Sequence, residues 1–257
     1  MANKVDMIES VGSSKNEGAV ALVPLKGLRE VAVYTAKAFE KVRSDIYANK
    51  NLRTIFVQKR VTPNSVVAHP YVQAGLTADF VIVAPSKFRS YVLLWLNSSL
   101  GRGELLGGGF TKDTGMTSMK KIREVPIPLC ENSEEYFEIG LLGDFYFLAL
   151  MFQHEKNDNI EFSVAVNLYS RLINYASMEL LIPSEFRRAG VSIIESWKSL
   201  LKDMFPPQFK VTEDSIIRSI NEVFTTNNEL MLNVNRMKIF NSVFYPICVE
   251  TLHTYYK

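Results

Sequence analysis

The 257-residue sequence contains only two cysteines and three histidines, and glycine becomes scarce in its second half. Cys130 and Cys248 lie far apart and outside any metal-ligand spacing, which favours two free thiols in a reducing compartment. No hydrophobic run approaches the about 20 residues that a membrane-spanning helix needs. The segment from Met1 to Asn16 is polar and lacks the hydrophobic core of a signal peptide. These absences predict a cytoplasmic protein that binds no metal and has no membrane partner.

Catalytic motifs are also missing. A DNA aminomethyltransferase needs a glycine-rich cofactor loop and an Asn/Asp-Pro-Pro-aromatic motif, but the only double proline, at 206–207, is followed by Gln208. The glycines at 107–109 do not form a phosphate-binding loop, because no Gly-Lys-Ser/Thr follows them. No nuclease cluster of carboxylates stands out. We therefore expect no catalytic residue and no cofactor; an enzyme with an unrecognised site is the weakest alternative.

Charge is unevenly distributed although the net charge is only +2. Residues 1–132 hold 18 Lys and Arg against 11 Asp and Glu, a net charge of +7, whereas residues 133–257 hold 11 against 16, a net charge of −5. A basic half joined to an acidic half indicates an anionic ligand for the first and a different role for the second. The alternative is chance scatter over two solvated surfaces.

The hydrophobic pattern changes at the same place. Residues 1–18 are polar and predict a flexible lead. Between 19 and 132, short strand-like segments separated by Pro, Asn and Gly predict a compact, mostly β unit. From 133 to 257, helical periodicity predicts an all-α unit of about five helices, interrupted near Pro246. The predicted fold class is α+β, with a mixed, mostly β domain at 19–132 and a helical domain at 133–257.

One segment, 80–129, organises the first half. It predicts a buried strand, a helix, a glycine-rich connection, a short basic helix and an extended exit strand, in the order Phe80–Ala84, Phe88–Ser98, Gly101–Gly109, Ser118–Glu124 and Val125–Leu129. Shorter strands are expected before it, at Ala19–Leu25, Val31–Tyr34, Leu52–Val61, Ser65–Ala68 and Val72–Thr77. The segment Ala36–Arg43 is either a helix or a loop.

That order of elements resembles the target recognition domain of type I restriction–modification specificity subunits. The residues that carry the resemblance are Tyr91, Leu94, Leu96-Asn97-Ser98, Gly101, Thr117, Lys121-Ile122 and Val125-Pro126-Ile127-Pro128-Leu129. The resemblance implies sequence-specific binding of double-stranded DNA by a non-catalytic subunit of a restriction–modification or related phage-defence system. It also implies a DNA methyltransferase subunit as partner and, in the fuller assembly, a restriction subunit.

The sequence departs from the family in two ways. Family members usually carry two recognition domains, each followed by a long helix, whereas this chain has one candidate; a symmetrical homodimer would restore two. The Glu-Gln pair that often follows the Ile-Pro-Leu strand is replaced by the segment 130–134, Cys-Glu-Asn-Ser-Glu. We therefore expect the helical domain to serve assembly or the docking of a different partner.

Lys and Arg residues are the candidates for DNA contact, because affinity for DNA comes mainly from neutralised phosphates. One cluster comprises Arg53, Gln58, Lys59, Arg60 and Asn64; a second comprises Lys112, Thr114, Thr117, Ser118, Lys120, Lys121 and Arg123; and Arg89 and Arg102 flank the Leu-Asn-Ser helix. Phe110 is either a wedge against DNA or, as we favour, an anchor of its own loop. The alternative for the basic residues is a solvated charged face on a scaffold subunit without DNA readout.

Overall fold

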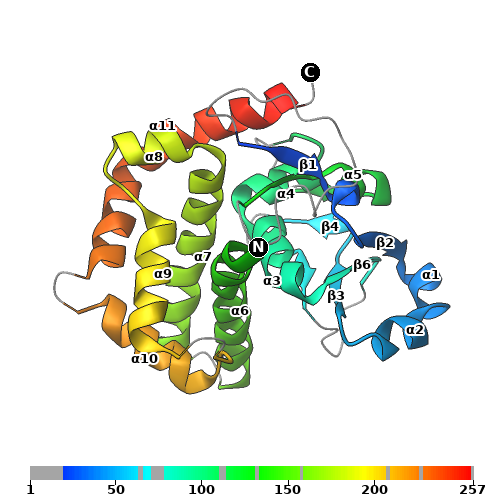
Figure 1. Ribbon diagram of the computed structural model, residues 1–257, viewed down its shortest axis with the longest axis horizontal. Helices are drawn as coiled ribbons and strands as arrows, with labels where there is room; N and C mark the ends of the chain where they lie inside the picture. Colours follow the sequence, from blue (N-terminus) through cyan, green and yellow to red (C-terminus); the bar gives the residue numbers. More distant parts are fainter. Residues whose placement is uncertain are drawn as a thin grey trace. The chain divides into compact units, whose positions relative to one another are not determined.

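The computed structural model describes residues 20–62, 66–70, 78–109, 114–130, 133–156, 159–206, 209–225 and 228–255. The fold class is α+β, as predicted: antiparallel strands and helices are mixed in the N-terminal half, and the described C-terminal half is helical (Figure 1). The described residues up to Gly140, together with those from Leu252 onward, form the first of two compact units, and Leu141–Thr251 forms the second. The expected flexible lead and the expected strand at Val72–Thr77 lie outside the described residues.

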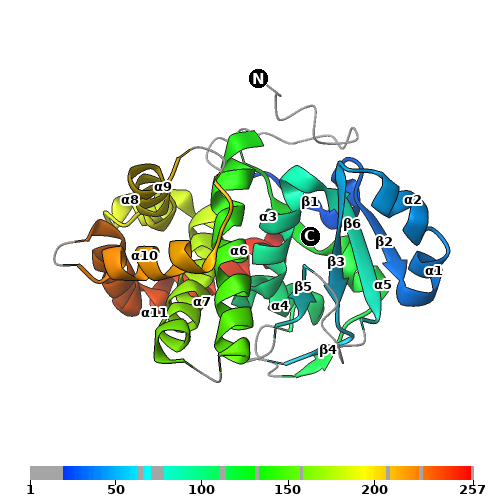
Figure 2. The same cartoon turned by 90° about the horizontal axis from the view of Figure 1, so that it is seen from below.

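A four-stranded antiparallel sheet, in the order β2-β6-β3-β5, forms the centre of the first unit (Figure 2). Its strands are β2 (Ala32–Thr35), β6 (Phe80–Pro85), β3 (Leu52–Val57) and β5 (Ala68–His69). On one face, Phe56 and Val81 pack with Phe39 of α1 (Ala36–Glu40) and Ile46 of α2 (Arg43–Ala48). Helix α3 (Ser86–Asn97) covers the opposite face. Because successive side chains of a strand alternate between faces and both faces are covered, β6 is hydrophobic throughout and β3 is hydrophobic from Ile55 to Val57.

Two side chains of α3, one in its middle and one in its last turn, form hydrogen bonds with two other strands. The Tyr91 hydroxyl donates a hydrogen bond to the carbonyl oxygen of Pro128 at 2.8 Å, and Pro128 lies in β8 (Pro126–Pro128), which pairs with β1 (Leu22–Pro24). Asn97 is buried at the last turn of α3; its Oδ1 accepts from the N–H groups of Val67 at 2.9 Å and Ala68 at 3.2 Å. Its Nδ2 donates to the Ala68 carbonyl at 2.9 Å. β5 is an edge strand, with β3 on one side only. The amide side chain of Asn97 forms hydrogen bonds with backbone groups of β5 and the residue before it, which a neighbouring strand would otherwise bond.

The glycine-rich passage is largely a helix, α4 (Ser99–Leu105), so its prediction as a connection is wrong up to Leu105. The Ser98 hydroxyl caps this helix by accepting from the N–H of Gly101 at 3.0 Å. A Cβ at Gly101 would lie 1.9 Å from the Trp95 carbonyl oxygen, which shows that this glycine permits close packing between successive helices. The helix ends at Gly107 and Gly108, whose positive φ angles of 76° and 77° form a Schellman cap.

Six helices follow the last strand, and the described residues from 133 onward contain no strand: α6 (Ser133–Glu155), α7 (Ile160–Leu181), α8 (Pro183–Arg188), α9 (Ile193–Met204), α10 (Glu213–Val223) and α11 (Glu229–Tyr255). The first two turns of α6 belong to the first unit, where the Tyr136 ring packs on that of Tyr91. The predicted interruption at Pro246 is wrong, because α11 continues through it. Pro246 is exposed, so water can bond the carbonyl that the missing N–H leaves free.

The second unit is held by an aromatic core. The ring of Phe145 in α6 lies 5.2 Å from that of Trp197 in α9 and 5.4 Å from that of Tyr169 in α7, measured between centroids. Phe205 and Phe209 complete the cluster around Phe145. The helices satisfy most of their backbone groups internally, and side chains add bonds between them: Glu179 of α7 accepts from the N–H groups of Ile193 at 2.8 Å and Ile194 at 2.9 Å.

Candidate nucleic-acid interface

The two basic clusters predicted from the sequence meet at a two-stranded ribbon. Strand β4 (Arg60–Val61) pairs antiparallel with β7 (Gly115–Met116), so that Arg60 lies opposite Met116 (Figure 2). The N–H of Thr117 donates to the carbonyl oxygen of Lys59 at 2.8 Å and extends this pairing. Residues more than fifty positions apart in the sequence are thereby brought side by side. We call this structure, with the first turn of the helix that follows it, the basic ribbon.

The basic ribbon carries several exposed side chains: Lys59, Arg60, Thr114, Met116, Ser118 and Lys120. Within the part of the chain that the structure describes, Lys59, Arg60 and Lys120 have no ion-pair or hydrogen-bond partner for their charged groups. The carboxylate of Asp79 bonds the backbone beside this surface: its Oδ2 accepts from the N–H of Lys59 at 2.7 Å. Three unneutralised cations on adjacent elements form a surface suited to a polyanion.

A short helix, α5 (Met119–Glu124), sets the direction of the second cluster. The Ser118 hydroxyl caps it by accepting from the N–H of Lys121 at 3.3 Å. The buried Ile122 fixes which face of the helix turns inward. Lys120 therefore projects into solvent beside the ribbon, whereas the side chain of its neighbour Lys121 turns back under it.

Lys121 is a structural residue in this arrangement. Its Nζ donates to the carbonyl oxygens of Leu106 at 3.1 Å and Met116 at 3.2 Å, which joins the end of α4 to β7. A Cβ at Gly107 would lie 3.2 Å from the Lys121 Cε, so the glycine at this position leaves room for the lysine stem. The predicted role of Lys121 in contacting DNA is replaced by one of positioning the ribbon.

Four other predicted residues do not present a free polar group on the ribbon surface. Thr117 takes part in the ribbon pairing but is only 2% exposed, so its side chain is buried here and its DNA contact stays a prediction. Arg53 is the second residue of β3, at the end of that strand far from Lys59, and donates to the carbonyl oxygens at positions 50 and 52. Arg89 and Arg102 are half-buried on α3 and α4. Lys112, Asn64 and Phe110 lie outside the described residues.

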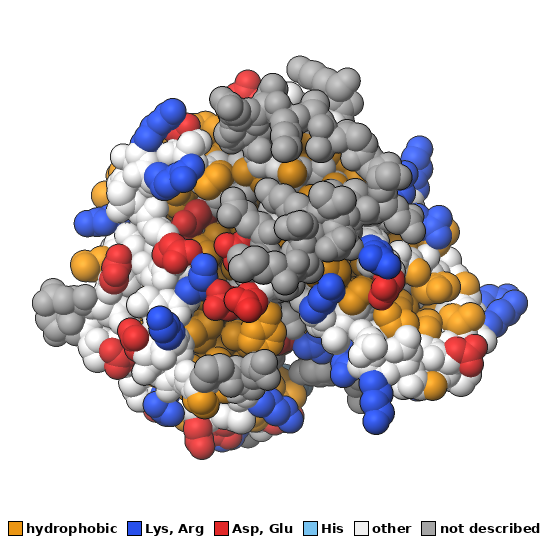
Figure 3. Space-filling view, viewed as in Figure 1, with side chains coloured by type: hydrophobic (Ala, Val, Ile, Leu, Met, Phe, Trp, Pro, Cys, Tyr) orange, Lys and Arg blue, Asp and Glu red, His pale blue; other side chains and the backbone are white. Residues whose placement is uncertain are grey.

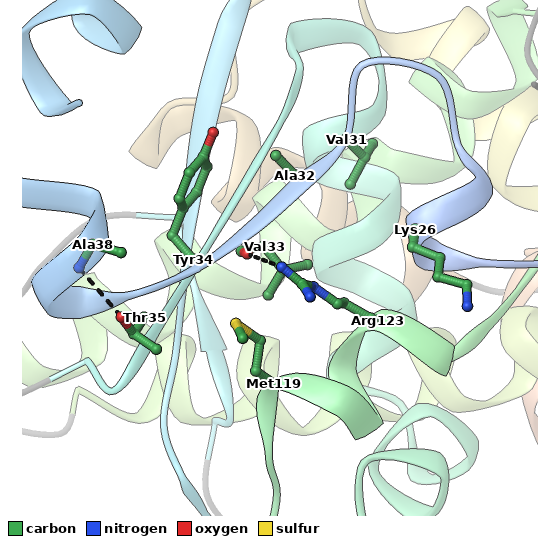
Figure 4. A pocket seen from close by; sticks show the side chains of 9 residues that line it. All are labelled: Lys26, Val31, Ala32, Val33, Tyr34, Thr35, Ala38, Met119 and Arg123. Carbon is green, nitrogen blue, oxygen red and sulfur yellow. Dashed lines mark hydrogen bonds between the residues drawn. The ribbon is translucent and has the colours of Figure 1, made fainter. Parts of the chain in front are cut away.

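Arg123 faces a different surface, a groove of about 460 Å³ beside the edge strand β2 (Figure 4). Its Nη2 donates to the carbonyl oxygen of Val33 at 3.1 Å. A backbone acceptor on the free edge of the sheet is thus occupied by a charged side chain, an arrangement that discourages pairing with another strand. Lys26, at the end of the same groove, is paired with Glu124 at 2.7 Å. Arg123 is therefore committed to the fold and does not belong to the ribbon.

Met116 was not among the residues predicted from the sequence; its side chain is 59% exposed, and it lies opposite Arg60 in the ribbon. The available signal was its alternation with Gly115 in an otherwise polar segment, but a two-residue strand is too short to establish a period. An exposed apolar side chain beside Arg60 provides the type of group that contacts a thymine methyl or a base step.

The described residues contain no cluster of three or more His, Cys, Asp and Glu side chains that would hold a metal ion. The two cysteines are buried, and burial raises the pKa of the Cys248 thiol to about 12, which disfavours the reactive thiolate. His69, in β5, has its pKa lowered by burial, an effect that its hydrogen bond with the Val66 carbonyl opposes. None of the described helices has the length and hydrophobicity required to cross a membrane.

Comparisons with models of protein families, with curated protein sequences and with solved structures gave no match.

Proposed function

We propose that this protein is a non-catalytic, sequence-specific DNA-binding subunit of a restriction–modification or related phage-defence system, and that the basic ribbon is its contact surface. The observation that carries the proposal is the pairing of β4 with β7. It brings Lys59 and Arg60 next to the segment that leads to Lys120, and among the described residues their charged groups have no ion-pair or hydrogen-bond partner. Such a subunit works in the cytoplasm together with a DNA methyltransferase.

The distribution of charge supports the proposal. On the face shown in Figure 3, Lys and Arg side chains predominate over the first unit, whereas side chains of both signs project from the second. A duplex carries one negative charge per about 1.7 Å of helix axis, so a row of unpaired cations releases counterions when it binds. Exposed Thr and Ser hydroxyls beside those cations can add contacts to phosphate or to base edges.

The test is the salt dependence of DNA binding, measured by fluorescence anisotropy with a duplex of random sequence and with genomic fragments. The double variant Arg60→Ala, Lys120→Ala removes one cation from each side of the ribbon. If both contact phosphates, the slope of log K against log salt should fall by about 1.8, since each lost contact contributes about 0.9. Lys121 is left intact because its substitution would disturb the ribbon itself.

The matched control is Lys37→Ala, Lys41→Ala, which removes two exposed lysines from α1 and its C-cap in the same unit. This control changes the net charge equally but leaves the ribbon intact, so its salt slope should equal that of the unsubstituted protein. Equal slopes for both double variants would show that the ribbon is not the contact surface. Absence of any binding at low salt, with the methyltransferase partner present, would favour the alternative of a scaffold subunit without DNA readout.

A further inference from the structure

Helix α11 has two hydrophobic faces, and only one of them is covered within its own unit. Leu230, Val234, Met237, Phe244 and Cys248 are buried on one side. Leu232, Ile239 and Val243 remain 46%, 75% and 56% exposed. Isolated exposed aliphatic side chains are normal on a protein surface, but three on one helical face form a stripe that needs an explanation.

The exposed residues follow the spacing of a helix-pairing seam. At 100° per residue, Leu232, Ile239 and Val243 fall within about 40° of one another, on the side opposite the buried face. Positions 232, 236, 239, 243, 246 and 250 are separated by alternating steps of four and three residues, the repeat by which two helices pack side by side. The stripe from Leu232 to Glu250 spans about 27 Å of helix.

Two charged residues of opposite sign lie in this stripe, at equal distances on either side of Val243. Arg236 and Glu250 are each seven residues from Val243, about 10.5 Å along the axis in opposite directions. If two copies of α11 pack antiparallel across a two-fold axis near Val243, each Arg236 lies beside the Glu250 of the other copy. A parallel arrangement would instead place like charges together. Nη1 of Arg236 donates to the Gly190 carbonyl at 2.9 Å, which holds the guanidinium at this end of the stripe.

We propose that the exposed face of α11, from Leu232 to Glu250, is the interface of an antiparallel homodimer. The occupant is a second copy of this chain, because the stripe is complementary to itself in both hydrophobicity and charge. A single pair of helices is smaller than a standard interface of about 1,600 Å², so we expect a weak dimer with a dissociation constant on the order of micromolar. The proposal does not depend on the basic ribbon or on DNA binding.

The first experiment is sedimentation velocity of the full chain, from about 1 to 200 μM, which brackets the expected dissociation constant. The unsubstituted protein should shift from monomer to dimer, and Ile239→Lys, Val243→Lys should remain monomeric with an unchanged melting temperature. Ile160→Lys is the matched control, since Ile160 is 78% exposed on α7, and it should still dimerise. A protein that is monomeric at every concentration, or a double lysine variant that dimerises normally, overturns the proposal.

Two further variants test the geometry. Glu250→Lys should weaken an antiparallel dimer at least tenfold, since it places two cations side by side at both ends; unchanged dimerisation excludes the antiparallel pairing. Val243→Cys should form an intermolecular disulfide under mild oxidation, because Val243 meets its own counterpart at the axis. Ile160→Cys should not, and the native Cys130 and Cys248 are buried and should not interfere. Failure of Val243→Cys to cross-link while the protein is dimeric places the interface elsewhere.

Discussion

The two units of this protein are stabilised in different ways. In the first unit, strands of two to six residues leave backbone groups that neighbouring strands do not reach, and individual polar side chains satisfy them. Tyr91, Asn97, Lys121 and Arg123 each donate to a backbone carbonyl of another element. In the second unit, long helices satisfy most of their own backbone groups, and a cluster of aromatic rings packs between them. Polar side chains such as Glu179 and Asn233 also bond the backbone of other elements there, so the contrast lies in the aromatic cluster of one unit and the short strands of the other.

This difference also explains what the resemblance to a target recognition domain can and cannot indicate. The residues that carry it include Tyr91, Asn97, Ser98 and Lys121, and the structure gives each a hydrogen bond that shapes the fold. The exposed cations of the ribbon lie outside that set. In this chain the residues of the motif shape the fold, and the cations exposed on the ribbon are different residues.

The comparison can be tested unit by unit, because each unit contains one of the two tryptophans, Trp95 in the first and Trp197 in the second. Replacing one tryptophan by Phe leaves a fluorescence signal that reports on the other unit alone. Each prediction about stability below is a difference measured within such a single-tryptophan background.

The largest effect is expected for Phe145→Ala in the second unit. The substitution removes a ring that contacts Tyr169, Trp197 and Phe205, and it leaves a cavity. The free energy of unfolding should fall by about 4 kcal/mol. Urea denaturation followed by Trp197 fluorescence measures it, and Phe224→Ala, at an exposed ring of the same unit, is the control. A loss no larger than that of the control would contradict the aromatic core.

A smaller effect, of about 3 kcal/mol, is expected for Asn97→Ala in the first unit. It leaves the buried N–H groups of Val67 and Ala68 without their acceptor. Trp95 fluorescence reports the transition, and Asn51→Ala, at an exposed position of the same unit, should stay within about 0.5 kcal/mol. If Asn97→Ala were as mild as Asn51→Ala, the bonds from α3 to β5 would not stabilise the unit.

Two adjacent lysines should separate structural from binding roles. Lys121→Met removes two hydrogen bonds to carbonyls and should cost about 1.5 kcal/mol. Lys120→Met should cost less than about 0.5 kcal/mol but lower the salt slope of DNA binding by about 0.9. Urea denaturation and anisotropy on the same two preparations provide both readouts. An equal loss of stability in both variants would contradict the assignment of Lys121 as the residue that holds the ribbon.

The smallest effects concern pH, and their signs are opposite in the two units. Burial lowers the pKa of His69, so the unfolded first unit binds more protons below pH 6.5, and its stability should fall as the solution is acidified through that range. Burial raises the pKa of Glu179 above 4.5, against hydrogen bonds from the N–H groups of Ile193 and Ile194 and the Ser192 hydroxyl. The folded second unit therefore binds more protons, and its stability should fall as pH rises through that raised pKa.

Urea denaturation between pH 4.5 and 8 with each single-tryptophan protein measures both trends. His69→Gln and Glu179→Gln should each remove the dependence from one unit and leave the other unchanged. If His69→Gln altered the pH response of the second unit instead, the assignment of that response to His69 would be wrong.

Much of the fold follows from local sequence. Hydrophobic periodicity and capping residues predict α7, α9 and α10, because a helix depends on neighbours three and four positions away. Thr212 and Ser215 form the capping box that opens α10, where the sequence predicts a helix start. The strand at Phe80 and the Ile-Pro-Leu exit strand are likewise found as β6 and β8. Their hydrophobic runs are continuous and bounded by proline, a signal that needs no knowledge of distant residues.

The tertiary structure decided which of the basic residues share a surface. Sequence alone marks Lys59, Arg60, Lys120, Lys121 and Arg123 as equivalent cations, since each is a charge in a polar segment. Pairing of β4 with β7 places Lys59, Arg60 and Lys120 together in solvent. Lys121 and Arg123 instead donate hydrogen bonds to carbonyl oxygens of elements distant in the sequence. Whether a lysine binds a ligand or the backbone depends on which acceptors the fold brings within about 3 Å, and spacing along the chain does not contain that distance.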